Sequence, residues 1–119
     1  MIDKLNKWKE TRSIELAYTI CEELSVLAEI LDWGKEKGIN NVKNQFNKMK
    51  EETDEADEAW AGSDVFHIKE EFGDMGVVWL LACQAAGLDP FEVLSVAHNK
   101  NKHRTGVTIN GNFIKDSNK

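Results

Sequence analysis

Proline and cysteine are both scarce in this chain of 119 residues, which holds one proline and two cysteines. With a single proline, and with glycines mostly at points where helices should stop, little in the sequence interrupts long helices. Cys21 and Cys83 lie in apolar helical patterns and have no CxxC partner, so we interpret them as small core residues and not as a disulfide. These absences favour an all-α protein from a reducing compartment.

Long apolar runs and targeting segments are also missing. The longest apolar stretch, residues 75–88, is interrupted by Gln84 and is too short to span a bilayer. The first residues contain no apolar core of a signal peptide, and no GxxxxGK[ST] motif occurs, which excludes a P-loop. We therefore expect a soluble, cytoplasmic protein with no membrane partner.

Basic residues are outnumbered, with 15 Lys and Arg against 21 Asp and Glu and a formal net charge of −6. This balance disfavours a general nucleic-acid binder, which needs cations facing phosphates. The charge is unevenly placed: residues 51–74 hold ten acids and one base, whereas residues 95–119 hold five bases and one acid. The function has to account for both segments.

Apolar periodicity and capping residues predict four main helices within a single domain, residues 1–119. We expect them at about 13–33, 41–61 with Asn40 as N-cap, 64–86, and 90–103. Residues 2–10 form either a separate helix or an extension of the first. Residues 107–109 and 112–114, around Asn110-Gly111, predict a β-hairpin with a type I′ turn within the tail, residues 107–119.

The predicted fold class is therefore an all-α four-helix bundle with a short C-terminal hairpin. From residue 77 to 86 the third helix is apolar on nearly every side, which one neighbouring layer cannot cover. We therefore expect a homodimer or homotetramer in which subunits share a core.

Carboxylates occur where a helical wheel places the core. At about 100° per residue, Glu71 and Asp74 lie on the same side of their helix as Val78 and Leu81. An ionised carboxylate among apolar groups costs several kcal/mol unless a cation compensates it. Glu52 and Glu55 share one face of the preceding helix and can meet these two acids across an antiparallel pair. Four inward carboxylates indicate a hard divalent cation, Mg²⁺, Mn²⁺ or Ca²⁺, and ligands on rigid helices with open metal positions favour Mg²⁺, with Mn²⁺ as a substitute.

The basic segment offers a second candidate site at the end of the last helix. Five residues lie there and could hold a polyphosphate: Asn99, Lys100, Lys102, His103 and Arg104. Bases near a helix C-terminus also complement the helix dipole without binding anything, and this alternative stays open. We interpret His67 as a hydrogen-bonding partner and not as a metal ligand. The four tryptophans are assigned to the core or an interface, with Trp60 as the best candidate for stacking on a base.

The order of these motifs resembles a known family. The segment Glu51-Glu52-Thr53-Asp54-Glu55, followed after fifteen residues by Glu71-Phe72-Gly73-Asp74, is similar to the EExxE and ExxD motifs of the MazG-like all-α nucleoside triphosphate pyrophosphohydrolases. Residues 45–48, 97–106 and 111–115 also resemble flanking segments of bacterial and phage members. The resemblance covers residues 32–116, and the N-terminal helix, residues 1–31, is less well covered.

The resemblance implies Mg²⁺-dependent hydrolysis of a (deoxy)nucleoside triphosphate to the monophosphate and pyrophosphate, in nucleotide-pool house-cleaning. It implies four metal ligands: Glu52, Glu55, Glu71 and Asp74. It implies catalytic roles for Glu51 and Glu52, with the general base left open. It implies that Gln45 and Lys48 line the nucleotide pocket and that Asn99, Lys102 and Arg104 bind the phosphates.

Two other functions remain open from the residues alone. A non-catalytic nucleotide sensor would use the same scaffold without turnover. A helical interaction module would need no metal, because its inward acids would simply pair with Lys or Arg.

Overall fold

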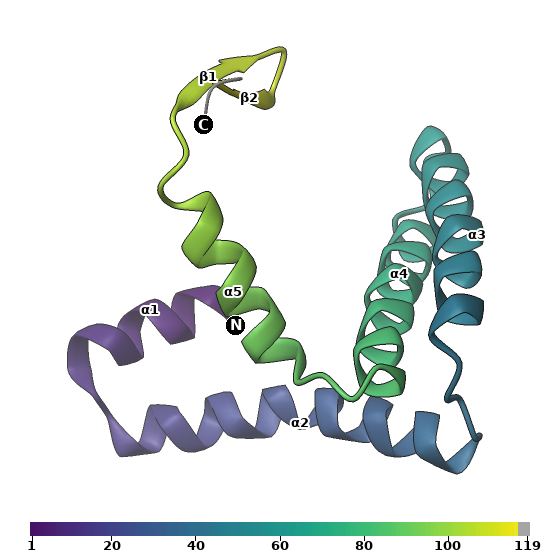
Figure 1. Cartoon of the computed structure of the whole chain (residues 1–119). Coiled ribbons are helices and arrows are strands. Elements are labelled where there is room, and N and C mark those ends of the chain that lie inside the picture. Colours follow the sequence, from purple (N-terminus) through teal and green to yellow (C-terminus); the bar gives the residue numbers. More distant parts are fainter. Residues whose placement is uncertain (117–119) are drawn as a thin grey trace. The chain divides into compact units, whose positions relative to one another are not determined.

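The computed structural model describes residues 1–116, which form five helices and a two-stranded sheet (Figure 1). The chain divides into two compact units, residues 1–86 and a second unit that begins at Gly87. The first unit contains α1 (Ile2–Thr11), α2 (Ile14–Glu36), α3 (Val42–Ala61) and α4 (Val65–Ala85). The second contains α5 (Pro90–Asn101), β1 (Gly106–Ile109) and β2 (Asn112–Lys115).

The first two helices are separate, which answers the question that the sequence left open. Arg12 adopts a left-handed conformation with φ 55°, and this conformation ends α1. Its guanidinium lies over the ring of Trp8 at 4.4 Å from the centroid. The Ser13 side chain then caps α2 by accepting a hydrogen bond from the backbone N–H of Leu16. An ion pair between Lys4 and Glu23 also ties α1 to α2.

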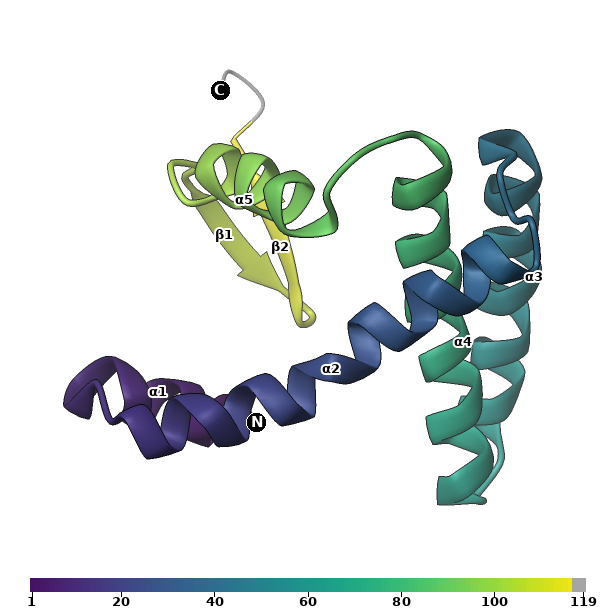
Figure 2. The ribbon, with the colours of Figure 1, turned by 90° about the horizontal axis from the view of Figure 1, so that it is seen from below.

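The helices α3 and α4 pack side by side as an antiparallel hairpin, as both ribbon views show (Figures 1 and 2). Asn41 caps α3 through Asn44, one residue later than the predicted cap Asn40, and Asp64 caps α4. The short connection at Gly62 brings the acidic α3 directly against the apolar α4. The hairpin thus gives the antiparallel pair that the acidic motifs require.

The core of the first unit is small and lies mainly on α4. Eight apolar residues are buried: Ile20, Ala56, Ala59, Val78, Leu80, Leu81, Ala82 and Cys83. Five of them belong to α4, as its apolar sequence predicts. The helix α2 approaches α4 closely at the buried Gly34, where a β-carbon would overlap the Leu81 side chain. A larger residue at this crossing would force the buried Leu81 side chain to shift.

The second unit consists of a capped helix followed by the predicted hairpin. Asp89 accepts a hydrogen bond from the backbone N–H of Phe91, and Pro90 occupies the first turn of α5. The strands pair antiparallel, and both turn residues, Asn110 (φ 52°) and Gly111 (φ 79°), have the positive φ of a type I′ turn. The mostly helical fold with a short C-terminal hairpin is thus confirmed.

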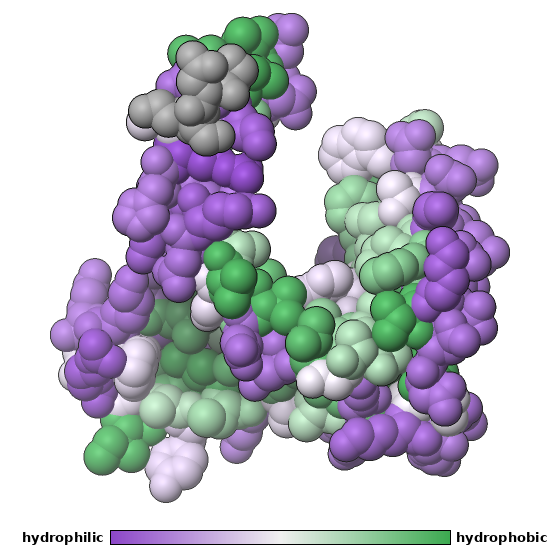
Figure 3. All heavy atoms as spheres, in the orientation of Figure 1, coloured by the Kyte–Doolittle hydropathy of each residue, from purple (hydrophilic) through white to green (hydrophobic). Residues whose placement is uncertain are grey.

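Large apolar side chains remain exposed on both units. Figure 3 shows hydrophilic side chains over the outer surface of α3, whereas apolar side chains are visible along α2. On α2 these include Ile14, Tyr18, Leu24, Val26 and Trp33, which are 36–75% exposed. No single helix within residues 1–116 is long and apolar enough to cross a membrane, although α4 and α5 taken together reach the required length and composition.

Candidate metal centre and adjoining pocket

Three carboxylates gather between α3 and α4. Glu52 and Glu55 lie one turn apart on α3, and Glu71 faces them from α4. One carboxylate oxygen from each lies within 4.8 Å of the others. The sequence therefore predicted correctly that the two acidic motifs meet across the helix pair. We call these three residues the carboxylate cluster.

In Glu52 and Glu71 only one of the two carboxylate oxygens lies near a basic side chain. Glu52 is 5% exposed, and its Oε1 lies 3.3 Å from Nζ of Lys48. The side chain of Glu71 is 15% exposed, and its Oε1 lies 3.8 Å from Nδ1 of His67, which is too far for a hydrogen bond. The Oε2 atoms of both glutamates are buried and have no hydrogen-bond partner. A buried anionic oxygen without a donor or cation is costly, so each of these atoms calls for a ligand.

The negative charges perturb the neighbouring acids. The charge of Glu52, followed by the adjacent Glu71, raises the pKa of Glu55 above its usual value. Partial loss of hydration beside α3, followed by the charges of Glu52 and Glu71, raises the pKa of Asp74, although its side chain is not buried. Both shifts mean that the fold without metal resists full ionisation of the site. A bound cation would reverse this preference.

The cluster fits a hard divalent cation. Its ligand atoms are all carboxylate oxygens, the type that Mg²⁺ and Mn²⁺ favour over zinc or copper. Neighbouring oxygens around an octahedral Mg²⁺ lie about 3.0 Å apart, since each metal–oxygen bond is about 2.1 Å. The three carboxylate oxygens, which lie within 4.8 Å of one another, would have to draw together by side-chain rotation to bind one ion. Glu52, Glu55 and Glu71 would hold the ion.

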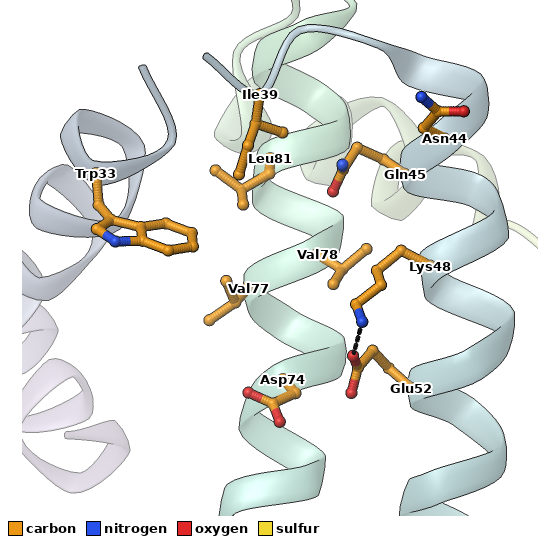
Figure 4. Close-up of a pocket in the computed structure, with 10 residues that line it drawn as sticks. All are labelled: Trp33, Ile39, Asn44, Gln45, Lys48, Glu52, Asp74, Val77, Val78 and Leu81. Atoms are coloured by element: carbon orange, nitrogen blue, oxygen red, sulfur yellow. Dashed lines mark ion pairs between the residues drawn. The ribbon is translucent and has the colours of Figure 1, made fainter. Parts of the chain in front are cut away.

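A pocket of about 420 Å³ adjoins the cluster (Figure 4). Glu52 and Asp74 lie at one end of it, and Asn44 and Gln45 lie at the other. The apolar part of its lining consists of Trp33, Ile39, Val77, Val78 and Leu81. Such a volume lies in the range of small-molecule sites, which combine apolar walls with a few polar groups.

The predicted site residues outside the cluster fall into three groups. Asp74 lies outside the three-carboxylate cluster and is exposed, but it lines the pocket together with Gln45 and Lys48. The side chain of Glu51 is 64% exposed and lies 3.4 Å from Nζ of Lys48.

The predicted phosphate ligands Asn99, Lys102 and Arg104 belong to the second unit, at the end of α5 and just after it. Their role stays a prediction.

Sequence reasoning missed the aromatic wall of the pocket. Trp33 lines it, whereas the favoured candidate Trp60 lies against Phe72, with ring centroids 6.3 Å apart. Asn44 was also missed. Trp33 lies near the end of the apolar helix α2, and hydrophobic periodicity alone cannot distinguish a residue that lines a pocket from one in the core. For Asn44 the available signal was its place one residue before Gln45.

Comparisons of this chain with protein-family models, curated proteins and solved structures found no match.

Proposed function

We propose that this protein is a cytoplasmic Mg²⁺-dependent pyrophosphohydrolase that converts nucleoside triphosphates to the monophosphate and pyrophosphate. The observation that carries the proposal is the pair of buried, unpartnered Oε2 atoms of Glu52 and Glu71 within a cluster that borders a pocket. The order of the acidic motifs and their resemblance to the MazG-like family supply the reaction class. Asp74, on the pocket wall, is the proposed fourth ligand.

The reaction consumes one water molecule. Water attacks the α-phosphorus, the bond to the oxygen bridging the α- and β-phosphates breaks, pyrophosphate leaves, and one proton is released. A bound Mg²⁺ would offset phosphate charge and lower the pKa of the attacking water. Glu52 and Glu51 are the proposed catalytic carboxylates. Glu51 is exposed beside Lys48, which leaves it accessible to accept a proton.

The pocket supports a nucleotide as the substrate. The indole of Trp33 provides a face on which a base can stack, and the amides of Asn44 and Gln45 offer donors and acceptors for its edge. Lys48 lies between these groups and the cluster, where the phosphate chain would run. By resemblance, Asn99, Lys102 and Arg104 bind further phosphate oxygens.

We further propose that the working form is a homodimer or homotetramer in which the predicted helical bundle is completed. Its support is the exposed apolar surface of both units, including Phe91, Leu94, Phe113 and Ile114 of the second unit, each at least half exposed. Leaving so much apolar surface in water is unfavourable, and burying it between subunits would stabilise them.

Pyrophosphate release tests the proposal directly. The purified protein is incubated with a panel of ribo- and deoxyribonucleoside triphosphates and Mg²⁺, and the products are separated. We expect monophosphate and pyrophosphate in equal amounts, with loss of turnover in Glu52→Gln and Asp74→Asn. Full activity in either variant would overturn the assignment of that residue.

One observation favours the alternative of a metal-free interaction module. Lys48 already pairs with Glu52, as a basic partner of an inward acid in such a module would. Thermal unfolding separates the two functions, because Mg²⁺ stabilises a true carboxylate site by mass action and leaves the module unchanged.

A further inference from the structure

Lys48 occupies an unusual position between the pocket and the cluster. It lies one turn before Glu52 on α3, and its Nζ is 3.3 Å from Oε1 of Glu52 and 3.4 Å from Oε2 of Glu51. Its side chain is 50% exposed and lines the pocket, with the ammonium turned toward Glu52 (Figure 4). It can therefore move without disturbing the core.

Glu52 depends on this lysine for compensation in the metal-free protein. It is the one buried charged residue among residues 1–116, and Lys48 is its only ion-pair partner there. A buried carboxylate that loses its cation is strongly unfavourable. The lysine therefore compensates Glu52 only as long as no other cation does.

We propose that Lys48 is an exchangeable counter-ion, which holds Glu52 in the metal-free protein and is released to bind a substrate phosphate when a divalent cation takes Glu52. The proposal rests on the proposed metal site and adds an order of events: the metal replaces Lys48 at Glu52, and Lys48 then binds phosphate. The ammonium of lysine is a compact charge on a flexible stem, so it can leave Glu52 and remain within the pocket.

Electrostatics gives the exchange its direction. A divalent cation at the cluster repels the Lys48 ammonium and takes over its partner Glu52. The released ammonium then lies on the pocket wall, where a phosphate chain restores its compensation. By linkage, the metal and the polyphosphate must strengthen each other's binding, and Lys48 is the residue that couples them.

Nuclear magnetic resonance of the Lys48 ammonium tests the exchange directly. The full-length protein is labelled with ¹⁵N at lysine Nζ, and the Lys48 signal is assigned from its absence in Lys48→Met. We expect the signal to move toward that of an unpaired lysine as Mg²⁺ is added. It should move again when inorganic tripolyphosphate is added with Mg²⁺ in excess.

A calorimetric titration with Mn²⁺ alone gives the second readout. Lys48→Met should bind Mn²⁺ about tenfold more tightly than the unaltered protein, a typical strength of coupling between sites. The matched control is Lys50→Met on the same helix, because Lys50 forms no ion pair in the part of the chain described. It should change the affinity less than twofold.

The outcomes separate the two proposals. If Mn²⁺ binds but the Lys48 signal stays unchanged at saturating Mg²⁺, the exchange is wrong and the metal site stands. If neither the unaltered protein nor Lys48→Met binds Mn²⁺, the metal site and the exchange are both wrong. Equal affinities in Lys48→Met and Lys50→Met also overturn the exchange.

Discussion

Replacing Glu52 with glutamine should change thermal stability in opposite directions with and without Mg²⁺. The substitution keeps the shape of the side chain and removes its charge. Without metal, the charge of Glu52 faces that of Glu71 with oxygens no more than 4.8 Å apart, and both side chains are largely buried. Removing one charge therefore relieves a repulsion.

The size of the relief follows from Coulomb's law. Two unit charges 4.8 Å apart repel by about 1 kcal/mol in water and about 3.5 kcal/mol at an effective dielectric constant of about 20. The lost ion pair with the half-exposed Lys48 offsets part of this, so we expect a net gain of about 1–2 kcal/mol. For a chain of this length that is roughly 4–8 °C in Tm.

In Mg²⁺ the unaltered protein should become more stable than Glu52→Gln. At a Mg²⁺ concentration about 100 times its Kd, binding stabilises the unaltered protein by about 2.7 kcal/mol, or roughly 11 °C. Glu52→Gln lacks a ligand and should shift by little. The variant is then the more stable protein in EDTA and the less stable one in Mg²⁺.

Differential scanning fluorimetry in EDTA and in Mg²⁺ measures both values. Glu58→Gln is the matched control, since Glu58 is exposed on the same helix and lies outside the cluster. It should leave the Tm in EDTA nearly unchanged and keep the full Mg²⁺ shift. A Glu52→Gln protein that is less stable in EDTA and retains the Mg²⁺ shift would refute the reasoning.

Further predictions concern pH, the pocket, the helix crossing and the assembly. The raised pKa values of Glu55 and Asp74 stabilise the metal-free protein fully below the ordinary pKa values of 4.5 and 3.8. This stabilisation is lost as pH rises through the raised pKa values, so the Tm in EDTA should fall over that range. Asp74→Asn should make the dependence of Tm on pH flatter. In Mg²⁺ the trend should reverse, because protons compete with the metal. Trp33→Ala should weaken nucleotide binding about 5- to 150-fold by calorimetry and leave the Mg²⁺ shift unchanged, since stacking contributes about 1–3 kcal/mol per base. Gly34→Ala should lower stability by about 1–3 kcal/mol in denaturant unfolding, because its β-carbon overlaps Leu81. Sedimentation at micromolar concentration should give a dimer or tetramer, and a monomer would contradict the proposed assembly.

Local chemistry explains why the helix boundaries could be predicted. Asp89 and Pro90 mark the start of α5, and Asn110-Gly111 dictates the hairpin turn whatever surrounds it. The N-caps identified from single residues were accurate to within one position, as Asn41 in place of Asn40 shows. These features are set by residues adjacent in the sequence, so they can be predicted without knowledge of the tertiary structure. The predicted end of the first main helix at residue 33 was wrong, because α2 continues through Gly34 to Glu36.

The site was only partly predictable, because it depends on how elements cross. Helical periodicity placed Glu52, Glu55 and Glu71 on facing surfaces, and they do meet. Asp74 lies on the pocket wall and not in the cluster, although a helical wheel gives it nearly the same direction as Glu71. The wheel gives a direction around one helix axis and carries no information on the distance to side chains of the partner helix. For the same reason the approach of α2, which brings Trp33 to the pocket, was not anticipated.

The most direct test of the central claim is product analysis with one nucleoside triphosphate and excess Mg²⁺. The proposed function predicts that nucleoside monophosphate and pyrophosphate appear in equal amounts and that EDTA abolishes both. Formation of the diphosphate and inorganic phosphate, or no turnover of any nucleotide with Mg²⁺ or Mn²⁺, would contradict it.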